Sequence, residues 1–237
     1  MSKINKKVLI FGIPHSGTTI LKSIIGHIEE VNNILGEHKH IDDIKLPPAK
    51  KFNLIKFPQV LPSFFTQEYG EYIKIFIIRN PLWVVSSRLR RNPTRNPSYF
   101  IKQYLDAAKY FVHYSCKPLL NLHLIRYEDM FDNNFKELKT IFGAIGFKFT
   151  DDIFNNELYK NQTGKSSSTP SRPKEEDHNL FRAWQINQPF KNLNHISKIA
   201  IAPHIMDELT NNKIVQKVYP HITLVKKKYK LYNGNKV

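Results

Sequence analysis

The sequence predicts an α/β fold: a doubly wound parallel sheet flanked by helices, with a P-loop-like turn after its first strand. Short apolar runs alternate with longer segments in which apolar residues recur at helical spacing. A glycine-containing loop, Gly12–Thr19, lies between the first apolar run and the first helical pattern. This order is typical of parallel strands joined by crossover helices. With 237 residues, the chain is long enough for one such domain with a sizeable core.

Each element is predicted from its own local pattern. Strands are expected where apolar runs are too short for helices, at residues 7–12, 52–57, 72–79 and 122–127. Helices are expected from about Gly17 onward and over residues 81–91, 99–117 and 134–145. Asn80-Pro81 is typical of a helix start, because an N-cap residue is followed by proline, whereas Pro93 and Pro97 are expected to break the chain. We expect one domain over residues 1–237, with a core at about 7–212 and a basic tail over 213–237.

The composition indicates an anionic partner. The formal net charge is +16, which favours a nucleotide, a polyanionic acceptor, nucleic acid or an anionic surface as ligand. Cys116 is the only cysteine, so no internal disulfide can form, and its aromatic helical surroundings predict a buried thiol. The first strand begins near residue 7 and no apolar stretch approaches the roughly 18–20 residues of a membrane span. We therefore expect a soluble, cytoplasmic protein without a signal peptide.

The first loop predicts an anion-binding site. Its spacing is that of the phosphate loop Gly-x-x-x-x-Gly-Lys-Ser/Thr, except that Thr18 stands where the lysine is expected. A strand–loop–helix turn aims backbone N–H groups and the helix dipole at one point, and Ser16, Thr18 and Thr19 add hydroxyl donors. Gly12 and Gly17 permit tight turns and a close approach of the ligand. The alternative is a plain tight turn between strand and helix.

The identity of the anion follows from what the loop lacks. An ATP or GTP enzyme needs the loop lysine, a Mg²⁺ ion and an aspartate at the end of a neighbouring strand. Here the strand at residues 72–79 ends in Arg79, whose charge repels Mg²⁺ and attracts a second phosphate. Ser87 lies two turns into the next helix and can converge with Arg79 on one anion. A structural ion pair is the alternative for Arg79.

Three motifs in order resemble the sulfotransferase family, which uses 3′-phosphoadenosine 5′-phosphosulfate (PAPS). They are the loop Pro14–Thr19, the segment Arg79–Ser87 with its arginine and serine eight residues apart, and Arg126-Tyr127-Glu128-Asp129. The resemblance covers roughly residues 7–145 and is specific because all three motifs occur together. It implies a parallel sheet flanked by helices, in agreement with the periodicity.

The resemblance also implies roles for individual residues. Pro14, His15, Ser16, Gly17, Thr18 and Thr19 would hold the 5′-phosphosulfate. Arg79 and Ser87 would hold the 3′-phosphate, and Tyr127 would approach the adenine, with a core tyrosine as the alternative. Glu128 and Asp129 are expected to be structural, as an ion pair and a helix cap. Lys165 and Arg172, in the polar loop 161–178, are candidates for the family's basic loop that closes over the cofactor.

Two catalytic assignments are less direct. The family usually carries lysine or arginine where this chain has His15, so a protonated imidazole would have to neutralise the departing phosphate. Some family branches have a glutamate after the first helix that acts as general base, and Glu37 stands in a similar place. The cytosolic branch instead uses a histidine after the second strand, where this chain has none. Glu37 is thus the expected general base, and His38 and His40 are the competing candidates. The alternative for Glu37 is a loop carboxylate that only pairs with Lys39.

The function implied by the resemblance is transfer of a sulfuryl group from PAPS to a hydroxyl or amine, leaving adenosine 3′,5′-bisphosphate (PAP). The expected acceptor is a small molecule, glycan, lipid or peptide, with no metal and no nucleic acid. Two alternatives stay open: a P-loop nucleotide kinase, and a non-enzymatic module that binds polyanions through its basic surface.

Overall fold

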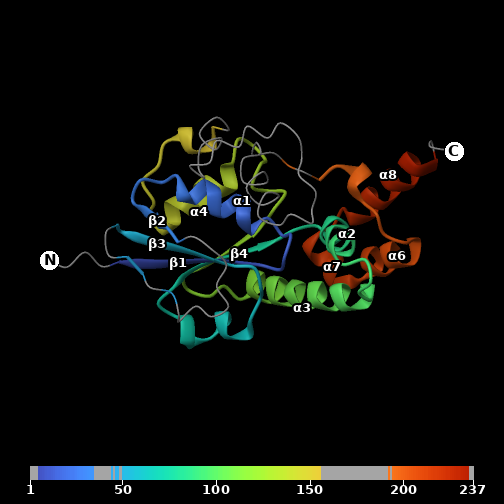
Figure 1. The fold of residues 1–237 in the computed structure, drawn as a ribbon, viewed down its shortest axis with the longest axis horizontal. Helices are drawn as coiled ribbons and strands as arrows, with labels where there is room; N and C mark the ends of the chain where they lie inside the picture. Colours follow the sequence, from blue (N-terminus) through green and yellow to red (C-terminus); the bar gives the residue numbers. More distant parts are fainter. Residues whose placement is uncertain are drawn as a thin grey trace.

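The computed structural model describes residues 5–34, 44, 46–47, 50–155, 192 and 194–234. Within these residues a parallel sheet has the strand order β2-β3-β1-β4-β5 (Figure 1). The strands are β1 (Lys6–Phe11), β2 (Val31–Asn33), β3 (Phe52–Phe57), β4 (Ile73–Ile78) and β5 (Leu122–Arg126). The predicted strands and the parallel sheet are confirmed. Because β3 and β4 flank β1 on opposite sides, the chain reverses its direction of winding next to β1, where open α/β sheets bind ligands.

Helices cover both faces of the sheet (Figure 1). Helices α1 (Thr18–Gly26) and α4 (Lys136–Ile145) lie on one face, and α3 (Pro97–Cys116) lies on the other. The helices gathered beyond one end of the sheet are α2 (Pro81–Arg91), α6 (Pro203–Asn211), α7 (Lys213–Val218) and α8 (Ile222–Gly234). Short 3₁₀ turns are η1 (Pro62–Phe65), η2 (Gln67–Tyr69), η3 (Asp151–Phe154) and η5 (Ile196–Lys198).

The core follows from the alternation of side chains along the central strand. Val8 and Ile10 pack with the buried face of α1 and α4, whereas Leu9 and Phe11 pack with the aromatic face of α3. Strands β3 and β4 are buried along their whole length because helices or turns cover both faces. Stacking of Phe11 on Phe76, with ring centroids 4.9 Å apart, fixes β1 against β4 directly before the first loop.

Three details differ from the sequence-based expectation. Helix α3 begins at Pro97, because Asn96 accepts a hydrogen bond from Ser98 N at 2.9 Å and proline suits the first helical position. The short strand β2 was not expected, since three residues give no periodic signal. Cys116 is exposed at the end of α3, so the prediction of a buried thiol was wrong.

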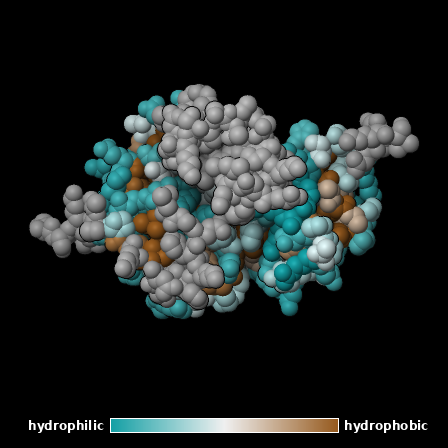
Figure 2. All heavy atoms as spheres, in the orientation of Figure 1, coloured by the Kyte–Doolittle hydropathy of each residue, from teal (hydrophilic) through white to brown (hydrophobic). Residues whose placement is uncertain are grey.

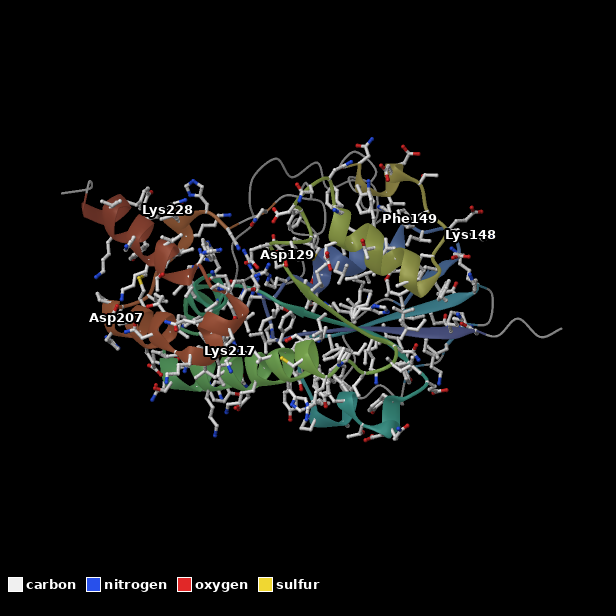
Figure 3. All side chains as sticks on the ribbon, turned by 180° about the vertical axis from the view of Figure 1, so that it is seen from behind. Asp129, Lys148, Phe149, Asp207, Lys217 and Lys228 are labelled. Atoms are coloured by element: carbon white, nitrogen blue, oxygen red, sulfur yellow. The ribbon has the colours of Figure 1, made fainter. Side chains whose placement is uncertain are left out.

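The C-terminal segment expected to be a basic tail contains two helices. Val215, Val218, Tyr219 and Ile222 are buried with the residues of α3 and α6. An ion pair between Asp207 and Lys226, 2.6 Å long, joins α6 to α8 (Asp207 is labelled in Figure 3). These helices therefore belong to the packed structure.

The described part of the face shown in Figure 2 is mostly polar. Seen as in Figure 1, the described surface is mostly hydrophilic, and apolar atoms occupy small separate areas (Figure 2). Among the described helices, none is long and apolar enough to cross a membrane.

Candidate functional site

The loop between β1 and α1 is shaped to receive an anion. The loop turns back through a hydrogen bond from Ser16 N to the Ile13 carbonyl, 3.1 Å long, and His15 adopts a left-handed φ of 72°. Gly17 caps α1 with φ 104°, and no described side chain caps the helix. The first N–H groups of α1 are therefore available to a ligand at the positive end of the helix dipole.

Both glycines of the loop are required by close approach of other atoms. A Cβ atom on Gly12 would lie 2.4 Å from the carbonyl oxygen of Ile77 and 2.6 Å from Ser16 Oγ. A Cβ atom on Gly17 would lie 2.4 Å from Cδ2 of Tyr127. Contacts this short do not occur, so the loop fits against β4 and Tyr127 only with glycine at these positions.

The hydroxyl groups of the loop lie in different environments. Ser16 is fully buried, and its Oγ makes no hydrogen bond to the described part of the chain. An unsatisfied buried hydroxyl costs about 1–3 kcal/mol, which an anion bound in the loop would recover by accepting its hydrogen bond. Thr18 is also buried, whereas Thr19 is half-buried and accepts a hydrogen bond from Lys56 Nζ at 3.4 Å.

Lys56 supplies a cation that sequence reasoning missed. It is the penultimate residue of β3, pairs with Ile10 of β1 and is only 6% exposed. Its ammonium group contacts Thr19 in the first turn of α1, so a positive charge from the neighbouring strand lies beside the loop that lacks the lysine. The available signal was a lysine inside an otherwise buried strand, where burial of a charge is unusual without a partner.

Arg79 connects the end of β4 to the loop. Its Nη1 donates to the carbonyl oxygen of His15 at 3.3 Å, and its Nε and Nη2 donate to Asn194 Oδ1 at 2.8 and 2.5 Å. Burial lowers the pKa of Arg79, partly offset by Tyr127 and Glu128, but a guanidinium stays charged at neutral pH. The structure therefore brings the predicted loop and the predicted arginine together.

The ring of Tyr127 packs against both the first loop and Arg79. It is fully buried, its ring lies against Gly17, and the guanidinium carbon of Arg79 lies 4.3 Å from its ring centroid. This cation–π contact fixes the plane of the guanidinium. Because the ring is covered by Gly17 and Arg79, the geometry shows a supporting role, and contact with an adenine stays a prediction.

The two serines of α2 differ in their contacts. Asn80 caps the helix as predicted, accepting from Leu82 N at 3.1 Å. Ser86 is fully buried and donates to the Leu82 carbonyl at 2.6 Å while accepting from Ala200 N at 3.0 Å. Ser87 is half-buried and has no hydrogen bond to the described residues. No described residue therefore competes with a ligand for this hydroxyl, and its role at a phosphate stays a prediction.

The acidic residues after β5 have structural contacts. Arg126 and Asp129 form an ion pair with distances of 2.6 and 2.9 Å, whereas a helix cap was the role expected for Asp129 (labelled in Figure 3). Glu128 accepts hydrogen bonds from Asn80 N at 3.1 Å and from Tyr219 Oη at 2.9 Å. Burial raises the pKa of Glu128, and these donors oppose the rise by stabilising the carboxylate. Glu128 therefore ties the start of α2 to the C-terminal helices.

Several predicted site residues lie outside the described residues: Glu37, His38, His40, Lys165 and Arg172. The choice of general base and the closing loop consequently stay predictions. Across the described ranges, no three His, Cys, Asp or Glu side chains gather as metal ligands would, and the metal-free reaction stays a prediction as well.

Comparison with known proteins identifies the fold. No protein-family model and no curated protein matches the chain. Among solved structures it is similar to mouse sulfotransferase SULT7A1 complexed with PAP, with TM-score 0.55 and 17% identity over 94% of this chain and 88% of that one. It is also similar to the sulfotransferase domain from the curacin biosynthetic pathway, with TM-score 0.52 and 12% identity over 94% of this chain and 99% of that one. The parallel sheet, the order of its strands and these two likenesses together show that the chain has the sulfotransferase fold.

Proposed function

We propose that this protein is a PAPS-dependent sulfotransferase that moves a sulfuryl group to a hydroxyl or amine acceptor. The observation that carries the proposal is the hydrogen bond from Arg79 Nη1 to the His15 carbonyl, 3.3 Å long. This hydrogen bond joins two elements that are chemically suited to anions, the start of α1 and the guanidinium after β4. A nucleoside with separate 5′ and 3′ anionic groups matches two such elements side by side, and the sulfotransferase fold supports this ligand.

The 5′-phosphosulfate fits the loop Pro14–Thr19. Backbone N–H groups at the start of α1 and the buried Ser16 hydroxyl would donate to its oxygens, together with Thr18 and Thr19. Lys56, beside Thr19, would offset the charge that develops on the departing phosphate. In this proposal a protonated His15 is an additional donor and not the only cation, and the charge of Lys56 removes the need for a metal.

The 3′-phosphate would bind Arg79 and the hydroxyl of Ser87. Arginine offers a forked, permanently charged donor that suits phosphate oxygens. Tyr127 would fix the plane of this fork, and an edge contact with adenine is proposed in addition. Lys165 and Arg172 are proposed to cover the bound nucleotide.

The reaction itself needs positioning, charge stabilisation and one base. The acceptor oxygen or nitrogen forms a bond to sulfur while the bond from sulfur to the 5′-phosphate oxygen breaks, and PAP leaves with that electron pair. The acceptor proton passes to a general base, for which Glu37 is proposed before His38 and His40. The acceptor is proposed to be a small molecule, glycan, lipid or peptide rather than nucleic acid, and the reaction to occur in the cytoplasm.

Calorimetry with PAP and with ATP–Mg²⁺ tests the proposal. We expect tight binding of PAP, weak binding of ATP–Mg²⁺ and a large loss of PAP affinity in Arg79→Gln. Arg95→Gln is the matched control, since Arg95 is exposed and lies over the Tyr99 ring at 3.9 Å. Preference for ATP–Mg²⁺ would favour a kinase, and steeply salt-dependent binding that ignores Arg79 would favour a polyanion-binding module. Transfer of label from PAPS to a panel of acceptors then identifies the acceptor.

A further inference from the structure

Asn194 lies between two opposite charges of the site, the Arg79 guanidinium and the Glu128 carboxylate. Its side-chain oxygen accepts from Nε and Nη2 of Arg79 at 2.8 and 2.5 Å. Its side-chain nitrogen donates to Oε1 of Glu128 at 2.5 Å. One side-chain amide therefore separates the guanidinium of Arg79 from the carboxylate of Glu128.

The amide is held by its neighbours in the chain. The carbonyl oxygen of His195 accepts from Trp83 Nε1 at 3.0 Å, and Ala200 N donates to Ser86 Oγ at 3.0 Å. Both contacts are to α2, the helix that also carries Ser87. The segment that presents Asn194 is therefore fixed to the same helix that is proposed to bind the 3′-phosphate.

An amide satisfies both partners at once. A carboxylamide has an acceptor for the cation and a donor for the carboxylate, whereas an aspartate has no donor and an alanine has neither group. Without the amide, Glu128 and Arg79 would be free to pair directly in a partly buried site, where such pairing is strong. A guanidinium paired with a carboxylate has less charge to offer an approaching phosphate.

The hydrogen bonds of Arg79 leave part of its fork open. Asn194 takes one N–H of Nε and one of Nη2, and His15 takes one of Nη1. A guanidinium has five N–H groups, so two of them, one on each terminal nitrogen, have no partner among the described residues. Each of these can donate to a phosphate oxygen.

We propose that Asn194 is a positioning residue that keeps Arg79 from pairing directly with Glu128 and so leaves the arginine available to the 3′-phosphate. This inference rests on the proposed function. It assigns a role to a residue that lies 115 positions from Arg79 in the sequence.

The test is the ratio of affinities for PAP and adenosine 5′-monophosphate, which lacks the 3′-phosphate, measured by calorimetry. Asn194→Ala should lower this ratio about 10- to 100-fold, because the phosphate must then compete with Glu128 for the guanidinium. The affinity for the monophosphate itself should stay unchanged. Adding Glu128→Gln to Asn194→Ala should restore most of the ratio, since the competing carboxylate is gone.

Asn194→Asp should lower the ratio at least as far, by placing a carboxylate directly on Arg79. The matched control is Asn212→Asp, which makes the same change of charge at the N-cap of α7, where aspartate caps equally well. Thermal unfolding of each variant shows whether it is folded.

An unchanged ratio in folded Asn194→Ala would overturn the inference. A reduced ratio that Glu128→Gln fails to restore would also overturn it, because Asn194 would then act only as a structural support. A wild-type protein that binds PAP no better than the monophosphate would contradict the proposed function itself, and this inference with it.

Discussion

Replacement of Gly17 by alanine tests how the first loop is supported. Gly17 has φ 104°, a left-handed conformation that alanine adopts with strain. A Cβ atom there would lie 2.4 and 2.9 Å from Cδ2 and Cε2 of Tyr127 and 3.2 Å from Cδ1 of Ile77. Tyr127 is fully buried, so its ring has no room to swing away. The loop and the ring must therefore separate in this variant.

The expected loss of stability has two parts. The left-handed conformation costs alanine about 1–2 kcal/mol. Forcing an additional methyl group against a buried ring costs about 1–3 kcal/mol. Together these give about 2–5 kcal/mol, compared with a total stability of about 5–15 kcal/mol for a typical domain. Gly17→Ala should therefore fold but lose a large share of its stability.

Alanine variants of two other glycines serve as controls that separate the conformational cost from the steric cost. Gly146 also has a positive φ of 83° but nothing within 4 Å of an added Cβ, so Gly146→Ala should show the conformational cost alone. Gly143 lies within helix α4 and likewise has no atom within 4 Å. Gly143→Ala should stabilise the protein by up to about 1 kcal/mol through helix propensity. The difference between Gly17→Ala and Gly146→Ala then measures the contact with Tyr127.

The assay is urea unfolding of the wild type and the three variants at one pH, followed by calorimetry with PAP. Since Arg79 lies over the Tyr127 ring, a displaced ring also moves the guanidinium, and PAP affinity should fall only in Gly17→Ala. If Gly17→Ala lost no more stability than Gly146→Ala, the close approach of loop and ring would be refuted. Unchanged PAP affinity in Gly17→Ala would refute the link between Tyr127 and Arg79.

Further predictions use single contacts of the site and the fold. Ser86→Ala should lower the free energy of unfolding by about 1–3 kcal/mol, because the N–H of Ala200 loses its acceptor, whereas Ser87→Ala should keep its stability and weaken PAP binding. Equal urea midpoints for the two serine variants would contradict this distinction. Lys56→Gln should lower kcat/KM for PAPS about 100-fold in the label-transfer assay, and near-normal turnover would show that the lysine does not serve the departing phosphate. Burial lowers the pKa of His27, so the folded protein holds fewer protons than the unfolded chain below about pH 6.5, and stability should fall as the pH drops through that value. His27→Gln should reduce this loss in urea titrations at about pH 7.5 and about pH 5; the same loss in both proteins would exclude His27 as a source.

Strands β3 and β4 could be predicted because they are buried along their whole length. A short, mainly apolar run such as 52–57 or 72–79 indicates a buried parallel strand even though each contains a lysine. The start of α3 was misplaced because Pro97 was taken as a break, although proline after an asparagine cap begins a helix. The position of Cys116 could not be predicted, since periodicity alone does not show which helix face a partner covers.

The site could be predicted only where its residues form local motifs. The loop and Arg79 have such motifs, and the structure places them in contact. Lys56 had a weaker signal, a charge inside an apolar strand, whose meaning depends on the strand order. Asn194 had no signal, because its role comes from hydrogen bonds to two residues far away in the sequence.

A crystal structure of the protein with PAP tests the central claim most directly. The account predicts the 5′-phosphate on the N–H groups at the start of α1 and on Ser16 Oγ. It predicts the 3′-phosphate on the two open N–H groups of Arg79, with Asn194 still between Arg79 and Glu128. A nucleotide bound with its 3′-phosphate away from Arg79, or outside the loop Gly12–Thr19, would contradict it.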